Sequence, residues 1–251
     1  MALLEIQHLA KSFDGVKAVD HVSFAIEPGT ITSIIGPNGA GKTTLFNLIA
    51  GFLRQDAGTI NYKGKAIDVL SPSQRAECGI GRLWQDIRIF RNMTTLENLL
   101  VAKKNQPGEK ISNYLLRYKN VDKFEKQNRE AAERVIKFIR LDHKQNSLAQ
   151  DLSYGQQKLL ALGRLLMNEA ELLLLDEPTA GVNPVMIDEI LVLIQMLVKE
   201  GKTVLMIEHN VPKAMSISDW VYVMDEGRIE LHGSPAEVSS NPLLKEVYLG
   251  V

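Results

Sequence analysis

A glycine-rich segment limits the possible folds of this chain more sharply than any other stretch. It fits the pattern G-x-x-x-x-G-K-[ST] and reads Gly36-Pro37-Asn38-Gly39-Ala40-Gly41-Lys42-Thr43-Thr44. The β-branched run from Thr30 to Ile35 precedes it, and a helix-forming segment from Leu45 to Ala50 follows it, with Gly51 at the end. A strand, a glycine turn and a helix in this order predict a phosphate-binding loop in an α/β fold.

The chemistry of phosphate binding explains the spacing of this loop. Glycines at positions 36, 39 and 41 allow the backbone to fold tightly, so that successive N–H groups point at an anion. The following helix directs the positive end of its dipole at the same point. Lys42 would reach the β- and γ-phosphates of a nucleotide, and the Thr43 hydroxyl would bind Mg²⁺. The loop therefore predicts a nucleotide phosphate site.

Length, charge and cysteine content narrow the class of protein. The 251 residues suffice for one large α/β domain, or for a domain with an added lobe. The formal net charge is -1, so no overall basic field indicates a nucleic-acid partner. A single cysteine, Cys78, excludes an internal disulfide and fits a reducing compartment.

The sequence contains no obvious targeting or membrane-spanning segment. Residues 1–6 have neither a basic region nor a long apolar run, so we expect no signal peptide. The longest apolar stretch of helical size, Val185 to Val198, is interrupted by polar residues and is too short to span a bilayer. We expect a soluble cytoplasmic protein that would serve a membrane process only by docking onto another chain.

The first part of the chain predicts an antiparallel β subdomain. Apolar and polar residues alternate from Leu3 to Leu9 and from His21 to Glu27, as in half-buried strands. Phe13-Asp14-Gly15 forms a turn between them and places the Phe13 ring at the rim of the sheet. Residues 58–65 predict a further hairpin.

From residue 86 to residue 150 the pattern becomes helical and more polar. Thr94 or Thr95 caps a short helix ending near Val101, and a longer helix is expected from about Asp122 to Arg140. Positions 103–140 hold eleven Lys or Arg against five Asp or Glu. A solvated helical face is the favoured interpretation, and a surface facing anionic lipid or a membrane partner is the alternative.

After this lobe the pattern of a buried α/β sheet returns. Residues 171–176 and 203–207 are continuous apolar runs, which are typical of parallel strands buried on both faces. A helix from Pro184 separates them. Two further strands, near 220–224 and 228–232, and a short helix at 242–249 complete the expected order. The fold class is therefore α/β, with a mostly parallel sheet.

Two segments beyond the loop carry chemical groups. The strand from Leu172 ends in Asp176 and Glu177, where open α/β sheets bind ligands. Asp176 would hold Mg²⁺, directly or through water, and Glu177 would accept a proton from an attacking water. Ser153 begins a helix; taken alone it is an N-cap, and the alternative is a second anion site that includes Gly155.

Five ordered motifs resemble the nucleotide-binding subunits of ABC transporters. They are the phosphate loop, Gln85, Leu152–Gln157, Leu172–Glu177 and His209, and the resemblance covers essentially the whole chain. It implies one ABC ATPase domain over 1–251. Residues 1–85 and 151–251 would form the nucleotide-binding core, a P-loop NTPase fold with an antiparallel β subdomain, and residues 86–150 would form a helical lobe.

The resemblance also implies roles within one subunit. Phe13 would stack on adenine, and Lys42, Thr43 and Thr44 would hold the phosphates of ATP and Mg²⁺. Gln85 would contact Mg²⁺ or the attacking water and respond to the membrane partner.

Further roles that the resemblance implies involve a second subunit. ATP would lie between two head-to-tail ATPase subunits, and Ser153, Gly155 and Gln156 would bind the γ-phosphate of the opposing one. His209 would contact the γ-phosphate, although one of five histidines in a chain is more often structural. Its position just after the strand 203–207 favours the functional interpretation.

Two departures from the common family pattern resemble one subfamily, the ATPases of branched-chain amino acid importers. These are Tyr154, within Leu-Ser-Tyr-Gly-Gln-Gln, and the segment Ala180-Gly181-Val182-Asn183-Pro184. Residues 79–90 and 247–250 support the assignment, with Trp84 in place of the usual Phe. The resemblance implies transmembrane permease subunits, indirect cooperation with a solute-binding protein, and a peripheral location at the cytoplasmic face of the plasma membrane.

Three alternatives remain at this point. An exporter ATPase of the lipopolysaccharide type is the nearest, and Tyr154 and Asn183 argue mildly against it. A non-transport ABC ATPase acting on DNA or ribosomes usually carries coiled-coil insertions, whereas only a compact lobe separates Lys42 from Ser153. A GTPase or small-molecule kinase would leave the Ser153 segment unexplained, and no Asn-Lys-x-Asp guanine motif occurs.

Overall fold

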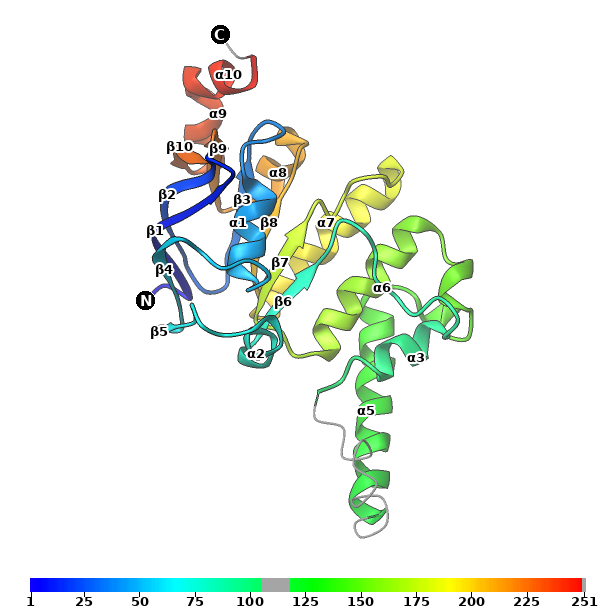
Figure 1. Cartoon of the computed structure of the whole chain (residues 1–251). Coiled ribbons are helices and arrows are strands. Elements are labelled where there is room, and N and C mark those ends of the chain that lie inside the picture. The colour runs from blue at the N-terminus through cyan, green and yellow to red at the C-terminus, as the bar shows by residue number, and fades with distance from the viewer. Residues whose placement is uncertain (105–117, 250–251) are drawn as a thin grey trace. The chain divides into compact units, whose positions relative to one another are not determined.

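The computed structural model describes residues 1–104 and 118–249 and divides into two compact units (Figure 1). The first unit comprises residues 1–85, 171–180 and 189–251. The second comprises residues 86–170 and 181–188. Each unit is described by itself.

A six-stranded sheet forms the centre of the first unit, in the order β10-β9-β3-β8-β7-β6. Neighbouring strands run parallel, except that β10 is antiparallel to β9. The strands are β3 (Ile31–Ile35), β6 (Ile80–Leu83), β7 (Leu172–Asp176), β8 (Thr203–Ile207), β9 (Trp220–Asp225) and β10 (Arg228–Gly233). Every residue of β3, β7 and β8 is buried, which confirms the expectation of a parallel sheet covered on both faces.

A second, antiparallel sheet has the order β2-β1-β4-β5. Its strands are β1 (Leu4–Phe13), β2 (Val16–Ile26), β4 (Ala57–Tyr62) and β5 (Lys65–Ala66). The first two strands are longer than predicted, because only Asp14 and Gly15 form the hairpin turn, both with positive φ. Register shifts between residues 6 and 12 break the alternation of apolar residues and hid this extension.

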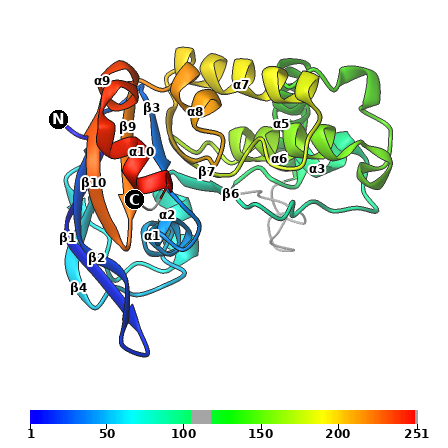
Figure 2. The ribbon, with the colours of Figure 1, turned by 90° about the horizontal axis from the view of Figure 1, so that it is seen from above.

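The core of the first unit lies between the two sheets and is filled by α1 (Lys42–Ile49). Apolar side chains from α1 join those of both sheets in one buried cluster, including Leu45, Leu48, Ile6, Ile60 and Leu174. Figure 2 shows α1 and α8 (Val211–Ile217) on opposite sides of the parallel sheet. Because α1 begins with the glycine-rich loop, this packing fixes the loop at the carboxyl edge of the sheet.

Shorter helices complete the first unit. They are α2 (Pro72–Cys78), α8, α9 (Pro235–Ser240) and α10 (Pro242–Leu249), together with most of α7 (Pro184–Lys199). Arg75 of α2 is 2% exposed and donates hydrogen bonds to the carbonyl oxygens of Leu48 and Ile49 at the end of α1. A guanidinium group at that position satisfies acceptors that the helix itself leaves open.

The second unit is helical. It contains α3 (Thr95–Leu100), α5 (Tyr118–Phe138) and α6 (Tyr154–Met167), with 3₁₀ turns η2 (Asp142–Lys144) and η3 (Ala149–Asp151). Thr94 caps α3 in a capping box with Glu97. Gly163 of α6 allows close approach, since a Cβ there would lie 2.8–3.2 Å from side chains of Leu99, Val135 and Ile139. This packing places α6 in the helical unit, which therefore extends beyond the expected limit at residue 150.

No helix within residues 1–104 and 118–249 combines the length and the apolar character that a bilayer-spanning helix requires.

Candidate functional site

A cavity of about 260 Å³ opens at the carboxyl edge of the parallel sheet in the first unit. It is lined by Ala18, by residues 38–44, and by Glu177 and His209. Apart from Ala18, which lies in β2, these residues follow β3, β7 and β8, whose carboxyl ends meet at this edge. The topology therefore gathers the glycine loop and two of the predicted catalytic residues around one space.

Steric contacts explain why two of the loop positions are glycine. A Cβ atom at Gly36 would lie 1.9 Å from the carbonyl oxygen of Met224, and one at Gly41 would lie 2.0 Å from that of Ala18. Gly41 has φ 96° and occupies the N-cap position of α1, where no side chain of the described residues caps the helix. The first N–H groups of α1 thus remain available to an anion.

Lys42 lies folded against its own loop. Its Nζ donates hydrogen bonds to the carbonyl oxygens of Gly36, at 2.8 Å, and Pro37, at 2.7 Å. Burial lowers the pKa of the Lys42 ammonium group, while the nearby carboxylates of Glu177 and Asp176 oppose that shift. An incoming phosphate would offer this cation a stronger, charged acceptor than the two carbonyls.

Three of the predicted catalytic residues meet at Glu177. Gln85 Nε2 donates a hydrogen bond to Oε2 of Glu177 at 3.0 Å, and His209 Nε2 lies 2.5 Å from Oε1. Glu177 has φ 49°, in the left-handed region, and its N–H donates to the carbonyl oxygen of Ile207 at 3.0 Å. A non-glycine residue in this region costs about 1–3 kcal/mol, and such strain is concentrated at functional sites.

Asp176, the neighbour of Glu177, is 3% exposed and ends the buried strand β7. Its Oδ2 accepts a hydrogen bond from Arg82 at 2.9 Å, whereas its buried Oδ1 has no hydrogen-bond partner among the described residues. Burial raises the pKa of this carboxyl, and the Arg82 guanidinium opposes the shift. A buried acceptor without a partner is costly, so this oxygen fits the role of a metal ligand.

The donor set around Asp176 fits Mg²⁺ shared with a phosphate. Within residues 1–104 and 118–249, no three His, Cys, Asp or Glu side chains form a cluster that could hold a metal by themselves. Mg²⁺ seldom needs such a cluster, because it is usually bound by one or two carboxylates, substrate phosphates and water. Asp176 Oδ1 and the exposed Thr43 supply oxygen ligands of this kind.

The predicted second anion site lies at the start of α6, in the second unit. The Ser153 hydroxyl accepts a hydrogen bond from the backbone N–H of Gln156 at 3.3 Å, and Gln156 Oε1 accepts one from the N–H of Ser153 at 3.0 Å. A Cβ at Gly155 would lie 2.9 Å from Met186 Cε. Ser153, Gly155 and Gln156 therefore lie close together at the N-terminus of α6. None of them lines the cavity of the first unit.

The structure does not bring Phe13 into the cavity lining. Phe13 ends β1 beside the hairpin turn, is 43% exposed, and has Lys11 Nζ 5.4 Å from its ring centroid. An aromatic ring at this exposed position is free to meet a flat ligand group, and the stacking role predicted for it stays a prediction.

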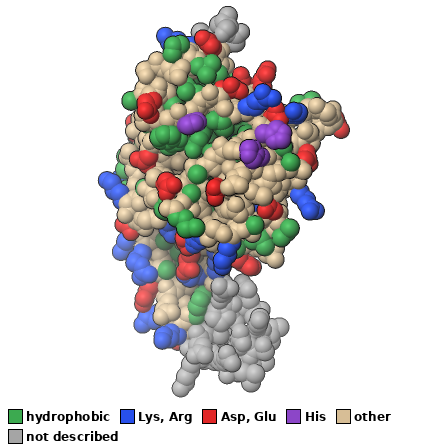
Figure 3. Space-filling view, turned by 90° about the vertical axis from the view of Figure 1, so that its left-hand side faces the viewer, with side chains coloured by type: hydrophobic (Ala, Val, Ile, Leu, Met, Phe, Trp, Pro, Cys, Tyr) green, Lys and Arg blue, Asp and Glu red, His purple; other side chains and the backbone are tan. Residues whose placement is uncertain are grey.

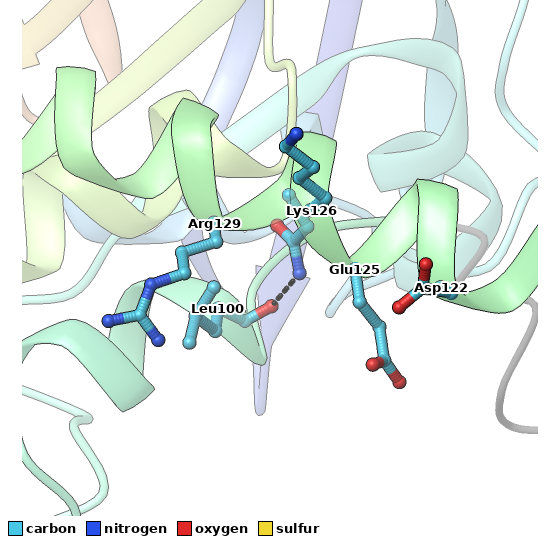
Figure 4. Close-up of a pocket in the computed structure, with 6 residues that line it drawn as sticks. Leu100, Asp122, Glu125, Lys126 and Arg129 are labelled. Atoms are coloured by element: carbon cyan, nitrogen blue, oxygen red, sulfur yellow. Dashed lines mark hydrogen bonds between the residues drawn. The ribbon is translucent and has the colours of Figure 1, made fainter.

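A second hollow within the described residues has a different character. In the second unit a hollow is lined by Leu100 of α3 and by Asp122, Glu125, Lys126, Asn128 and Arg129 of α5 (Figure 4). Asn128 Nδ2 donates to the carbonyl oxygen of Leu100 at 3.1 Å, and the charged groups around it are of both signs. On the face of the first unit in Figure 3, apolar, histidine and charged side chains are interspersed.

Residues 19–180 match the model of a protein family described as ABC transporter. The chain belongs to the ABC transporter family.

Relatives and solved structures within the ABC transporter family resemble the whole chain. A probable branched-chain amino acid transport ATP-binding protein LivG of Archaeoglobus fulgidus is 41% identical over 254 residues, covering 100% of this chain and 96% of the relative. The high-affinity branched-chain amino acid transport ATP-binding protein LivG of Escherichia coli is 38% identical, covering 99% and 98%. A crystal structure of the ADP conformation of an ATP-binding cassette superposes with a TM-score of 0.86, at 36% identity and full coverage of both chains. The predicted ABC ATPase architecture is thereby confirmed.

Two residues of this ABC site were not singled out from the sequence. Ala18 lines the cavity because its carbonyl lies against Gly41, a contact between distant segments that no local pattern indicates. Arg82 meets Asp176 only because β6 and β7 are neighbours in the sheet. Only its position close to Gln85 in the sequence could have drawn attention to Arg82.

Proposed function

We propose that this chain is the ATP-binding and ATP-hydrolysing subunit of a membrane transporter that imports branched-chain or related amino acids. The convergence of Gln85 and His209 on Glu177, beside the phosphate loop, carries the hydrolytic part of the proposal. The full-length similarity to branched-chain amino acid transport ATP-binding proteins supports the choice of solute.

The phosphates of ATP bind in the cavity formed by residues 36–44. Backbone N–H groups of the loop and of the first turn of α1 donate to phosphate oxygens, and Lys42 exchanges its two carbonyl acceptors for the β- and γ-phosphates. Asp176, Thr43 and Gln85 would hold Mg²⁺, which would supply positive charge to offset that of the phosphates. The Thr44 side chain adds a further polar contact to the phosphates.

Glu177 acts as the general base. One of its oxygens accepts a proton from the water that attacks the γ-phosphorus, while the bond from the γ-phosphorus to the β–γ bridging oxygen breaks and ADP leaves. The hydrogen bonds with Gln85 and His209 hold the carboxylate in place beforehand. His209 then contacts the γ-phosphate. Loss of a positioned general base slows a reaction by roughly 10²–10⁴-fold.

Completion of the site requires a second ATPase subunit. Ser153, Gly155 and Gln156 form a compact helix N-terminus that donates to the γ-phosphate bound by the opposing copy or homologue, in a head-to-tail pair. Phe13 stacks on the adenine ring. The pair docks onto transmembrane permease subunits at the cytoplasmic face of the plasma membrane and receives solute indirectly from a solute-binding protein.

A reconstituted transport assay tests this function. The chain is purified together with its membrane and solute-binding subunits and placed in lipid vesicles, and uptake of labelled leucine, isoleucine and valine is followed with ATP on the ATPase side. We expect ATP-dependent uptake of at least one of these amino acids. ATP hydrolysis without uptake, or stimulation only by an unrelated solute, would contradict the proposed substrate class.

A further inference from the structure

Arg82 of β6 occupies a buried position between the phosphate-loop helix and the proposed metal ligand. Its side chain is 5% exposed. Its Nη1 donates a hydrogen bond to Asn47 Oδ1 at 2.6 Å, and its Nη2 donates one to Asp176 Oδ2 at 2.9 Å. The guanidinium thus links α1 to the end of β7.

An aromatic cluster fixes the plane of this guanidinium. Its central carbon lies 3.9 Å from the ring centroid of Trp84, and 5.9 Å from the ring centroids of Phe46 and Phe52. Phe52 and Trp84 themselves meet edge to face, with centroids 4.7 Å apart and planes at 72°. Arginine stacks on aromatic faces in a way that lysine does not, and the stacked plane directs its N–H groups.

The two oxygens of Asp176 are therefore unequal. Arg82 holds Oδ2, whereas Oδ1 is buried and has no hydrogen-bond partner among residues 1–104 and 118–249. A carboxylate gripped at one oxygen by a fixed donor cannot rotate freely, so its other oxygen keeps one direction. Such restraint on a ligand carboxylate typically changes metal affinity by 10- to 100-fold.

We propose that Arg82 is a positioning residue that grips Asp176 Oδ2 and thereby presents Asp176 Oδ1 to the Mg²⁺ of Mg–ATP. This inference rests on the proposed function, because it assigns to Asp176 the role of metal ligand. The Trp84 ring contributes indirectly to the positioning of Asp176, because it holds the plane of the Arg82 guanidinium. Neither residue lines the phosphate-loop cavity.

The test compares nucleotide affinity with and without Mg²⁺. A fluorescent ATP analogue is titrated into the wild-type chain and into Arg82→Met, Arg82→Lys and Trp84→Leu, first in excess Mg²⁺ and then in EDTA. The Mg²⁺ enhancement is the ratio of the two affinities. Circular dichroism melting establishes that each variant is folded.

We expect Arg82→Met to reduce the Mg²⁺ enhancement about 10-fold or more while changing the affinity in EDTA less than about twofold. Arg82→Lys keeps the charge but not the forked, stacked geometry, so it should retain more of the Mg²⁺ enhancement than Arg82→Met does. Trp84→Leu, which leaves both polar partners in place, should reduce the enhancement by a smaller factor.

Arg75→Lys provides the matched control. Arg75 is also a buried arginine of the first unit, but its hydrogen bonds go to backbone carbonyl oxygens of Leu48, Ile49, Asp68 and Leu70. We expect it to lower the melting temperature without altering the Mg²⁺ enhancement. This control therefore shows that a loss of stability by itself does not reduce the Mg²⁺ enhancement.

Three outcomes would overturn the inference. The Mg²⁺ enhancement could be unchanged in folded Arg82 variants, it could fall equally in Arg75→Lys, or it could rise because Arg82 competes with the metal. If Arg82→Met does not fold, Arg82→Lys and Trp84→Leu decide the matter. A wild-type chain that binds no ATP in either condition would instead refute the proposed function, and this inference with it.

Discussion

Lys42 shows how a single residue prepares the loop for its ligand. Lys42 is 5% exposed, and its ammonium group donates hydrogen bonds to two carbonyl oxygens of the same loop. Burial lowers its pKa from the ordinary value of 10.5. A charged group with weak neutral acceptors inside a cavity is ready to exchange them for phosphate oxygens.

The lowered pKa of Lys42 predicts how nucleotide affinity depends on pH. The charged form attracts phosphate, and this form is lost as the pH rises through the pKa of Lys42 in the nucleotide-free protein. ATP affinity in EDTA should therefore begin to fall at a pH below 10.5. Fluorescence titrations between pH 7 and pH 10.5 measure it, and an affinity that stays constant over this range would contradict the assignment.

The close contact at Gly41 predicts a steric cost of substitution, which can be compared with the cost at a second glycine that has no such contact. Gly41→Ala places a Cβ 2.0 Å from the Ala18 carbonyl oxygen at φ 96°, whereas Gly201→Ala, at φ 83°, meets nothing within 4 Å. We expect Gly201→Ala to cost about 1–2 kcal/mol of unfolding free energy from the backbone alone. Gly41→Ala should cost clearly more and abolish ATP binding. Urea unfolding compares them, and equal costs would contradict the contact.

At this scale the loop residues were predictable because their spacing is set by local backbone chemistry. Lys42 and the three glycines could be recognised in nine consecutive positions. The partners of Asp176 could not be recognised in this way, because Arg82 is 94 residues away in sequence and meets it only through strand order.

Among the elements, α6 and α9 begin with the same capping box. Ser153 pairs with Gln156 at the start of α6, and Ser234 pairs with Glu237 at the start of α9. In each case the serine hydroxyl accepts from a backbone N–H and the longer side chain accepts in return. A cap without a proposed ligand and a cap to which the proposed function assigns a phosphate can therefore be compared within one chain.

Serine-to-alanine changes separate the two roles. Ser153→Ala and Ser234→Ala should each cost about 1 kcal/mol of stability, since each removes one cap. Only Ser153→Ala should also reduce ATP hydrolysis in the assembled transporter. The measurements are thermal melts and steady-state ATPase rates. Equal ATPase rates in the two variants would show that Ser153 acts only as a helix cap.

The elements that sequence patterns predicted are the long or fully apolar ones. The strands β7 and β8 were predicted with nearly correct limits, because each is a continuous apolar run, and the starts of the helices α6 and α7 were predicted nearly correctly. By contrast, α2, β6, α8 and α9 contain only four to seven residues each, too few to show a period. The local signals that mark the helices among them are their N-caps, at Ser71, Asn210 and Ser234.

On the scale of the whole molecule, the two predicted anion sites lie in separate units of the chain. The phosphate loop, Asp176 and Glu177 belong to the first unit, and Ser153, Gly155 and Gln156 belong to the second. On the proposed function, ATP joins these parts across two subunits and so drives their closure. Turning a mostly open pair into a mostly closed one requires a differential affinity of about 5.5 kcal/mol.

The central claim is that Glu177 is the base for ATP hydrolysis, and Glu177→Gln tests it most directly. Glutamine keeps the size and the hydrogen-bonding reach of the side chain but cannot accept the proton. In the reconstituted transporter we expect ATP affinity to be retained, closed ATPase pairs to accumulate, and turnover to slow by roughly 10²–10⁴-fold. Hydrolysis at a near-normal rate would contradict the account.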